Sequence, residues 1–217
     1  QYWSWGYRYL GRLHVALTLL AQRPFGSLLD IGCGDGRFLR EVQQRSAGRR
    51  LLGIDCSATA IRWAQALNPD LRFETADPLE RAPDERFDVV TLLEVIEHVP
   101  PARLDAFLSA AAACLLPGGR LILTTPHVNA RLDPRHYQHF DCARLREALQ
   151  DAFDDISCVP FDYVGWPTRL LLQALGGSGR YFIVTHPGLN TWFYRRYMRR
   201  CLEGSGERGC QRIAAVA

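Results

Sequence analysis

The sequence predicts an α/β fold in which helices cover both faces of a mainly parallel sheet. Short apolar runs of strand length alternate with helix-length segments from about residue 27 to residue 161. A glycine-rich turn directly follows the first of these runs, where a strand would pass into a helix. This alternation is typical of strands that are buried between two layers of helices. The 217 residues are enough for one domain with embellishments.

The expected elements follow one another in a regular order. Strands are predicted at residues 27–31, 51–54, 71–75, 87–93, 121–125, 156–161 and 212–216. Helices are predicted at residues 7–22, 37–45, 58–67, 103–115 and 142–152. Pro117-Gly118-Gly119 is expected to stop the fourth helix.

The domain organisation follows from where this pattern is interrupted. Residues 162–210 are rich in aromatic residues, arginine and glycine, and are predicted to form a helical cap inserted before the last strand. We therefore expect a single domain, residues 1–217. Its parts are an N-terminal helical lid (1–26), the core (27–161), the cap insertion (162–210) and the last strand (211–217).

The composition excludes several classes of protein. Hydrophobic residues make up 47% and charged residues 23%, as in ordinary globular domains, and the net charge of +3 is too small to indicate nucleic acid. The seven cysteines include no Cys-x-x-Cys pair, which argues against a disulfide framework and a cysteine zinc site. No signal peptide or apolar run of membrane-spanning length is visible. A cytoplasmic location is the simplest expectation.

Acidic residues and glycines gather where a ligand is expected. The run Asp30-Ile31-Gly32-Cys33-Gly34-Asp35-Gly36 lies between a strand and a helix, and its glycines permit a tight turn with close approach to a ligand. Asp55 ends the second strand, and Asp77 follows the third. Because parallel sheets bind ligands at the carboxyl ends of their strands, these three features are expected to meet in one crevice.

The motifs together resemble those of class I S-adenosylmethionine methyltransferases. Residues 28–36 resemble the first motif of that family, and residues 53–57 resemble its second. Residues 87–90 resemble its fourth strand, and residues 115–119 the turn before its fifth. The resemblance covers about residues 27–160 and the last strand. It implies a Rossmann-like, doubly wound, seven-stranded sheet of order 3-2-1-4-5-7-6 with strand 7 antiparallel.

The resemblance also implies which residues bind the cofactor. They are Asp30, Gly32, Cys33, Gly34, Asp55, Cys56, Asp77, Pro78, Leu93 and Glu94. In the family pattern Asp30 would face the amino group of the methionine part, Asp55 the ribose hydroxyls and Asp77 the adenine amino group. Leu93 and Glu94 would border the sulfonium.

A nicotinamide dehydrogenase is the alternative for this half of the chain, since it also uses glycines followed by an acid. Its loop usually reads Gly-x-Gly-x-x-Gly, whereas residues 32–36 read Gly-x-Gly-x-Gly with an acid just before them. It also offers no account of Pro117-Gly118-Gly119. The methyltransferase interpretation is therefore preferred.

Candidate catalytic residues follow the fourth strand. Glu97, His98 and the later His139 are the candidates for proton removal from an acceptor, with either histidine as the base. Small-molecule O-methyltransferases of the ubiquinone-biosynthesis type have a similar Glu-x-x-Glu-His run. Small-RNA 3′-end 2′-O-methyltransferases share it and use it to bind a divalent metal. The residues that would then be ligands are Glu94, Glu97, His98 and His139.

One observation weighs against the RNA-methyltransferase interpretation, and the catalytic interpretation has a structural alternative. Phe140-Asp141-Cys142 stands where the RNA enzymes have Phe-Glu-Trp, so we expect no metal and no nucleic acid. A purely structural role is also open, in which Glu97 and His98 cap the helix near Pro101 and His139 packs under the sheet edge.

Two aromatic segments flank the core. Tyr2 and Trp3 are candidates for a lid that covers the sulfonium by cation–π attraction, or alternatively anchor the first helix. Residues 190–200 could form a basic amphipathic helix that rests on an anionic membrane or holds a phosphorylated acceptor, or a cap helix with a solvated arginine face. Leu170–Leu175 is expected to line an acceptor pocket.

The preferred function is methylation by S-adenosylmethionine of an oxygen on a small-molecule or lipid- or sugar-linked acceptor. Metal-dependent RNA 2′-O-methylation is the second candidate. A cofactor-binding regulatory protein without turnover is the third. The residues that face the acceptor lie in the cap, where sequence spacing carries little chemistry.

Overall fold

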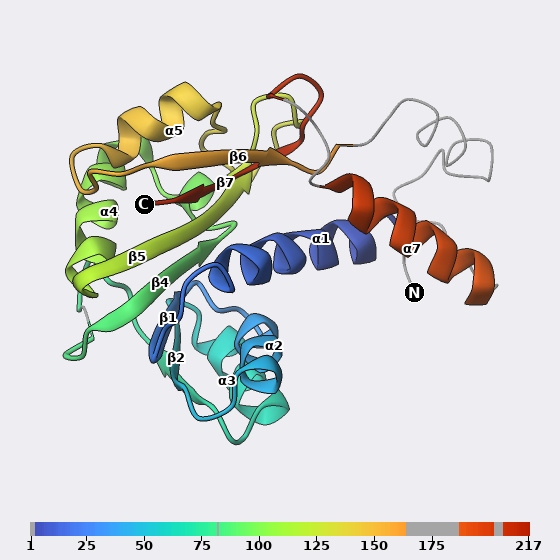
Figure 1. Cartoon of the computed structure of the whole chain (residues 1–217). Helices are drawn as coiled ribbons and strands as arrows, with labels where there is room; N and C mark the ends of the chain where they lie inside the picture. The colour runs from blue at the N-terminus through green and yellow to red at the C-terminus, as the bar shows by residue number, and fades with distance from the viewer. Residues whose placement is uncertain (1–2, 82, 164–186, 202–205) are drawn as a thin grey trace.

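The computed structural model describes residues 3–81, 83–163, 187–201 and 206–217. In this part of the chain the strands form one seven-stranded sheet of order β3-β2-β1-β4-β5-β7-β6 (Figure 1). Only β7 is antiparallel to its neighbours. The strands are β1 (Ser27–Ile31), β2 (Arg50–Asp55), β3 (Arg72–Thr75), β4 (Phe87–Leu93), β5 (Leu115–Pro126), β6 (Ser157–Phe161) and β7 (Arg212–Val216). The predicted fold class and strand order are confirmed.

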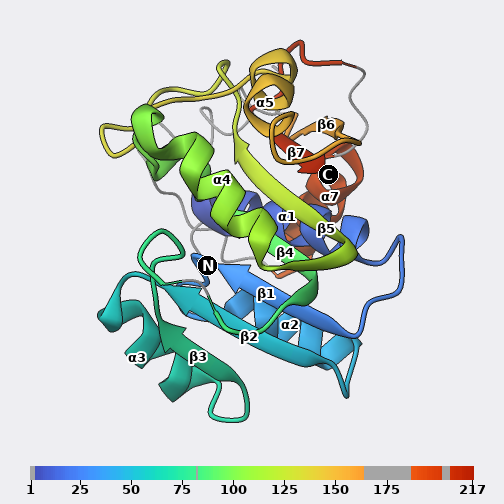
Figure 2. The same cartoon turned by 90° about the vertical axis from the view of Figure 1, so that its left-hand side faces the viewer.

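Helices cover both faces of this sheet (Figures 1 and 2). They are α1 (Trp3–Leu20), α2 (Arg37–Arg45), α3 (Ala58–Leu67), α4 (Leu104–Ala113), α5 (Cys142–Leu149) and α7 (Pro187–Cys201). Side chains of α4 and α5 pack with one face of the strands in one core cluster. Those of α1, α2, α3 and α7 pack with the opposite face in a second cluster. The two cores meet across the buried central strands, which explains why β1 is buried along its whole length.

The segment before the long central part of β5 differs from the prediction. The helix α4 already ends at Ala113, and Pro117-Gly118-Gly119 lies inside β5 rather than stopping the helix. The pairing of β4 and β5 runs from Phe87 opposite Leu115 to Val89 opposite Arg120. The strand therefore takes up the intervening residues as an irregularity, for which Gly118 supplies a left-handed φ of 75°.

Two polar side chains, the buried Arg120 and the half-buried Asp88, attach the first helix and strand to the sheet. The guanidinium of Arg120 in β5 donates hydrogen bonds to the carbonyls of Leu20 (2.7 Å) and Arg23 (2.8 Å), at the carboxyl end of α1. A cation there also interacts favourably with the helix dipole. The carboxylate of Asp88 in β4 accepts hydrogen bonds from the amides of Gly26 (2.8 Å) and Ser27 (2.7 Å). These contacts connect the start of β1 to the neighbouring strand.

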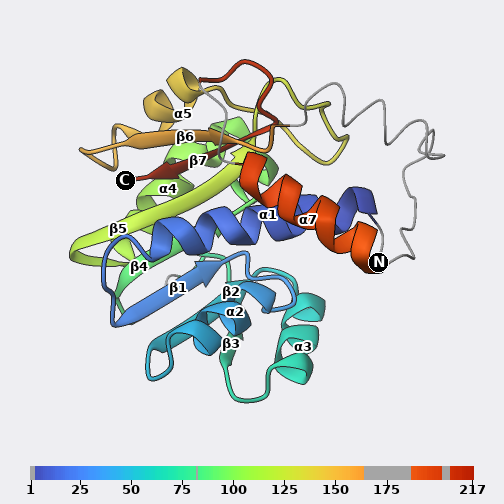
Figure 3. The same cartoon turned by 45° about the vertical axis from the view of Figure 1, so that its right-hand side comes forward.

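The helices α1 and α7 lie side by side (Figure 3). On α7 the side chains of Trp192, Arg195 and Arg199 are exposed, and the Arg196 guanidinium lies 5.5 Å from the centre of the Trp192 ring. This exposed basic surface is compatible with both sequence interpretations of residues 190–200, and membrane contact stays a prediction. None of the helices described is both long enough and apolar enough to cross a bilayer.

The lid expected from the side chains of Tyr2 and Trp3 lies outside the described part of the chain. So does the acceptor-pocket segment Leu170–Leu175. All seven cysteines are free thiols in this structure.

Candidate active site

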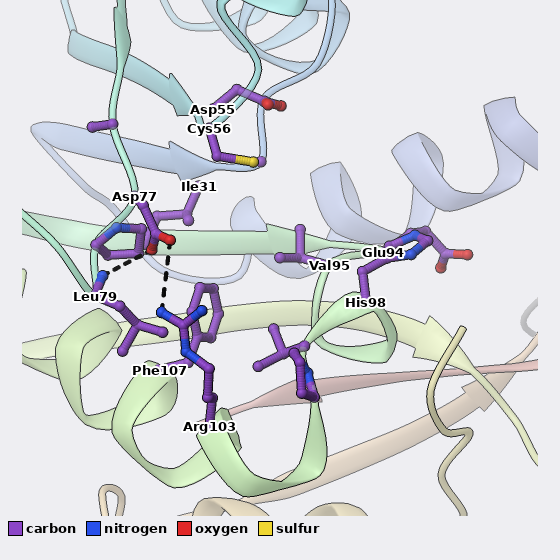
Figure 4. Close-up of a pocket in the computed structure, with 15 residues that line it drawn as sticks. Ile31, Asp55, Cys56, Asp77, Leu79, Glu94, Val95, His98, Arg103 and Phe107 are labelled. Carbon is purple, nitrogen blue, oxygen red and sulfur yellow. Dashed lines mark hydrogen bonds and ion pairs between the residues drawn. The ribbon is translucent and has the colours of Figure 1, made fainter. Parts of the chain in front are cut away.

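A cavity of about 370 Å³ opens at the carboxyl ends of β1, β2 and β4 (Figure 4). The predicted site residues that line it are Gly32, Asp55, Cys56, Asp77, Pro78, Glu94 and His98. Apolar side chains, among them Ile31, Val95 and Phe107, lie between the acidic groups. The crevice expected from the three separate sequence features is therefore present, and it is of a size that suits a small organic ligand.

The glycine loop is shaped by close contacts that leave no room for side chains. The amides of Gly32 and Cys33 both donate hydrogen bonds to the carbonyl of Ile54, at 2.8 Å and 3.0 Å. Gly32 has a φ of 76°, and a Cβ on it would lie 2.6 Å from a methyl carbon of Val95. Gly36 also has a φ of 76° and begins the α2 helix. These glycines are required by backbone conformation and by packing together.

Asp55 braces this loop from the end of β2. One carboxylate oxygen accepts a hydrogen bond from the amide of Gly34 (3.0 Å), and the other from the amide of Ser57 (2.8 Å). Ser57 in turn caps α3, since its hydroxyl accepts a bond from the amide of Ala60 (3.3 Å). The carboxylate is thus positioned at the cavity wall by backbone amides on both sides.

Asp77 faces a residue that sequence reasoning missed. Its carboxylate accepts a hydrogen bond from the amide of Leu79 (2.9 Å) and lies 4.0 Å from the guanidinium of Arg103 (Figure 4). Arg103 ends a short 3-10 helix, η2 (Pro101–Arg103), and lies across the cavity near Phe107. Only the fold brings these residues together, because the loop before α4 carries no motif that would single them out.

Four of the predicted cofactor residues from β1 onward, Asp30, Cys33, Gly34 and Leu93, do not line the cavity. Asp30 is buried in β1, where the hydroxyl of Thr91 donates a hydrogen bond to it (2.6 Å), and burial raises its pKa to about 7. The thiol of Cys33 is buried near Gly53, and burial raises its pKa strongly. Leu93 packs against the core on the side of α1. Direct contact of the Asp30, Cys33 and Leu93 side chains with a ligand would require rearrangement. Asp30 can still influence the glycine loop from its buried position in β1.

Glu94 borders the cavity, but its carboxylate is held by cations. One of its oxygens is 3.0 Å from Arg212 and 3.2 Å from Arg12, and its other oxygen accepts a bond from the Thr124 hydroxyl (3.2 Å). Burial alone would raise the pKa of Glu94, but the two arginines outweigh it and keep the pKa below its usual range. Glu94 is therefore ionised at the cavity border.

Glu97 has the opposite environment. It is fully buried in the short 3-10 helix η1 (Ile96–His98), and the hydroxyl of Thr125 donates a bond to one of its oxygens (3.2 Å). Its other oxygen is buried without a hydrogen-bond partner. Burial, together with the nearby charge of Glu94, raises the pKa of Glu97 well above its usual range. An incompletely satisfied buried carboxyl is costly and points to a functional role.

Three histidines form a chain beside Glu97. His98 lies on the cavity wall, and its Nδ1 is 3.0 Å from the carbonyl of Arg135. Its ring meets that of His136 edge to face, with the ring centres 4.7 Å apart. His136 Nδ1 lies 2.9 Å from His139 Nε2. The sequence singled out His98 and His139, and the structure adds His136 between them.

The predicted metal ligands are only partly brought together. Glu97, His98 and His136 each offer one ligand atom, and these atoms all lie within 4.8 Å of one another. Glu94 instead binds two arginines, and His139 is separated from the group by His136. His127, which was not among the predicted ligands, is buried, and its Nε2 lies 2.9 Å from Glu207.

Comparison with known proteins identifies the family. A sequence model of the family described as "Methyltransferase domain" matches residues 2–206. The chain belongs to this methyltransferase family. The prediction of an S-adenosylmethionine-dependent methyltransferase domain is thereby confirmed, and the dehydrogenase alternative is set aside.

Curated relatives share about half of this methyltransferase chain. It is 42% identical over 113 residues to a ubiquinone biosynthesis O-methyltransferase of Brucella anthropi, a match covering 48% of this chain and 44% of the relative. It is 40% identical over 120 residues to the protein of the same name from Chelativorans sp., covering 52% and 46%. The matches therefore span less than half the length of these relatives.

Solved structures share the fold over nearly the whole chain. A SAM-dependent methyltransferase from Archaeoglobus fulgidus has a TM-score of 0.67 at 20% identity, covering 97% of this chain and 93% of its own. The N-methyltransferase NodS from Bradyrhizobium japonicum has a TM-score of 0.63 at 16% identity, covering 96% and 94%. A phosphoethanolamine N-methyltransferase from Haemonchus contortus, crystallised with S-adenosyl-L-methionine, has a TM-score of 0.61 at 17% identity, covering 94% and 51%. These likenesses show the class I methyltransferase fold.

Proposed function

We propose that the cavity binds S-adenosylmethionine and that the protein methylates an oxygen of a small-molecule or lipid- or sugar-linked acceptor. The donor set fits this cofactor chemically. The carboxylates of Asp55 and Asp77 line one part of the cavity and can accept hydrogen bonds from hydroxyl and amino groups. Ile31 and Val95 supply apolar surface for a flat ring, and Gly32 brings the loop backbone to the cavity without an intervening side chain.

When bound, S-adenosylmethionine supplies a methyl group that its positively charged sulfur has already activated. The protein therefore has to orient the acceptor, exclude water and, for a hydroxyl of high pKa, remove a proton. The observation that carries the proposal of oxygen as the acceptor atom is the histidine chain beside the cavity. Methylation of an amine that is already neutral would need no such base.

The hydrogen bonds of the histidines define where their protons lie. A carbonyl oxygen only accepts, so Nδ1 of His98 carries a hydrogen, and Nε2 is the nitrogen that has a lone pair when the ring is neutral. We propose that Nδ1 of His136 donates to Nε2 of His139 across their 2.9 Å contact. The Nε2 of His136 then also keeps a lone pair. Burial lowers the pKa of His136, and His98 and His139 lower it further, which keeps the ring neutral.

We therefore assign the base to His98 or His136, with His139 orienting His136. Replacing His98 or His136 with Ala is expected to lower turnover about a hundredfold, since general bases contribute at least that much. The dissociation constant for S-adenosylhomocysteine should stay within about twofold, because neither ring is needed to hold the adenosyl part. His14→Ala is the matched control, since His14 is exposed on α1.

The measurement is transfer of a labelled methyl group to a panel of hydroxylated small molecules and lipid-linked acceptors. Wild-type turnover in both variants would refute the base assignment. Tight cofactor binding by the wild type without methylation of any acceptor would instead favour the non-catalytic alternative. Methylation of amines alone would contradict the choice of oxygen.

One observation favours a second candidate, metal-assisted O-methylation. Glu97, His98 and His136 lie close enough to share a divalent ion, and one oxygen of Glu97 has no hydrogen-bond partner. Two imidazoles and a carboxylate suit such ions, and a metal could polarise the acceptor oxygen in place of a base. In this candidate His136 replaces His139 in the ligand set that the family resemblance implied, and Glu94 is not a ligand.

Elemental analysis of the purified protein separates the two candidates. A stoichiometric divalent ion that is lost in Glu97→Gln would support the metal candidate, and a 3′-terminal RNA oligonucleotide would then join the acceptor panel. Retention of full turnover after exhaustive chelation would refute it.

A further inference from the structure

A buried ion network joins the ends of two strands that are far apart in the sequence. Arg212, the first residue of β7, binds two carboxylates at once. Its Nε lies 3.0 Å from Glu94, directly after β4, and its Nη1 lies 2.6 Å from Asp162, directly after β6. The Asp162 side chain is completely buried. The guanidinium of Arg212 therefore connects Glu94, at the cavity border, to Asp162, at the end of β6.

Both of these acids have an unusual backbone. Glu94 has a φ of 60° and Asp162 a φ of 61°, and every other described residue with a positive φ is a glycine. The left-handed region is strained for residues with a side chain, and such residues persist where their surroundings hold them in place. That the same arginine binds both side chains indicates that Arg212 holds both turns.

The ion network also contacts two helices, α1 and α7. Arg12 of α1 binds the same Glu94 oxygen at 3.2 Å. The hydroxyl of Tyr197 in α7 donates a hydrogen bond to Asp162 (2.7 Å). Tyr197 can lie this close because α1 has Gly11 beside it, where a Cβ would be 2.8 Å from the tyrosine hydroxyl. Both helices are thus connected to the ends of β4 and β6 through hydrogen-bonded charges.

Through Glu94, the ion network also affects the wall of the cavity. The left-handed turn at Glu94 directs the chain into Val95 and the 3-10 helix η1 that ends at His98. Val95 packs against the face of Gly32 that lacks a side chain. A change of backbone at Glu94 would therefore move both the apolar contact with the glycine loop and the imidazole of His98.

We propose that Arg212 is a positioning residue of the active site, which fixes the turn at Glu94 and thereby aligns the glycine-loop contact and His98 while connecting them to α7. Arg212 need not touch the cofactor for this. The inference rests on the cofactor cavity proposed above. Wild-type protein that fails to bind S-adenosylhomocysteine would refute the cavity, whereas the variants below test only the positioning role.

The first test compares Arg212→Gln with Arg212→Lys. Binding of S-adenosylhomocysteine is measured by titration calorimetry, and amide hydrogen exchange is followed in residues 94–98 and 187–201. We expect Arg212→Gln to weaken binding about tenfold and to raise exchange in both segments together. Arg212→Lys should restore part of the affinity and part of the protection from exchange, since it keeps the positive charge. Unchanged binding, or faster exchange in residues 187–201 alone, would overturn the proposal.

A second pair of variants tests the role of the turn directly, and it remains informative if Arg212→Gln does not fold. Glu94→Ala and Glu94→Gly remove the same carboxylate, but only glycine adopts the left-handed backbone without strain. If the network serves to hold the turn, Glu94→Gly should bind S-adenosylhomocysteine several-fold more tightly than Glu94→Ala and show slower exchange in residues 94–98. Equal loss in both variants would mean that the carboxylate itself is needed, and would overturn the positioning role.

Discussion

The two sides of the active site are built in different ways. The side of β1, β2 and β3 is made of glycines, backbone amides and two acids, one that ends β2 and one two residues after β3. The side of β4, β5 and β7 is made of buried or half-buried charged side chains that come from distant parts of the chain. Asp55 is braced by backbone amides of the glycine loop and of Ser57 at the start of α3, whereas Glu94 depends on the side chains of residues 12 and 212.

Under the proposed function, this difference would separate two tasks. A ligand held by backbone groups requires a fixed loop conformation, which a short contiguous motif can specify. A group that must gain or lose a proton needs a pKa that is set by burial and by neighbouring charges. Glu94 and Glu97 illustrate the second case, since they are three positions apart and their pKa values are shifted in opposite directions.

The largest expected effect tests whether the glycine side depends on backbone shape. Gly36→Ala should lower the free energy of unfolding by about 3 kcal/mol, because it combines left-handed strain with a Cβ that would lie 2.5 Å from the Phe73 ring. Gly48→Ala is the matched control, since Gly48 also has a left-handed φ but nothing within 4 Å. It should lose only about 1 kcal/mol. Equal losses in urea titrations would show that packing at Gly36 is unimportant.

The next prediction concerns the acid on the glycine side. Asp55→Asn should raise the dissociation constant for S-adenosylhomocysteine by roughly tenfold to a hundredfold, because charged hydrogen bonds to the loop and to the ligand are weakened. Asp155→Asn, an exposed acid before β6, should leave the constant within about twofold. Unaltered binding in Asp55→Asn would remove this residue from the cofactor site and weaken the contrast between the two sides.

The smallest effect tests the buried acid beneath the loop. Burial raises the pKa of Asp30 from 3.8 to about 7, so over that range the folded state holds a proton that the unfolded state has lost. The contribution of Asp30 to stability is therefore greatest in acid and falls as the pH rises towards 7. The unfolding free energy of the wild type minus that of Asp30→Asn should fall by about 1 kcal/mol per pH unit between pH 5 and 7. A difference that is independent of pH would contradict the raised pKa.

Much of the fold could be predicted because its signals are local. Strand length, helix periodicity and turn residues are properties of neighbouring positions, and β4, α2, α3 and β7 lie within the residues that these signals indicated. The boundary between α4 and β5 was predicted wrongly, because Pro117-Gly118-Gly119 reads as a helix stop until the pairing of β5 with β4 is known. Pairing with a distant strand outweighed the local turn signal there.

The sequence by itself determined the class I sheet, the glycine loop and the acids at the ends of β2 and β3, since each rests on contiguous residues whose backbone geometry is nearly obligatory. Only the tertiary structure decided what the side chains after β4 do. It placed Glu94 between Arg12 and Arg212, left one oxygen of Glu97 unpaired, and set His136 between His98 and His139. Burial and electrostatic neighbours arise from residues that meet only when the chain has folded, and no local spacing encodes them.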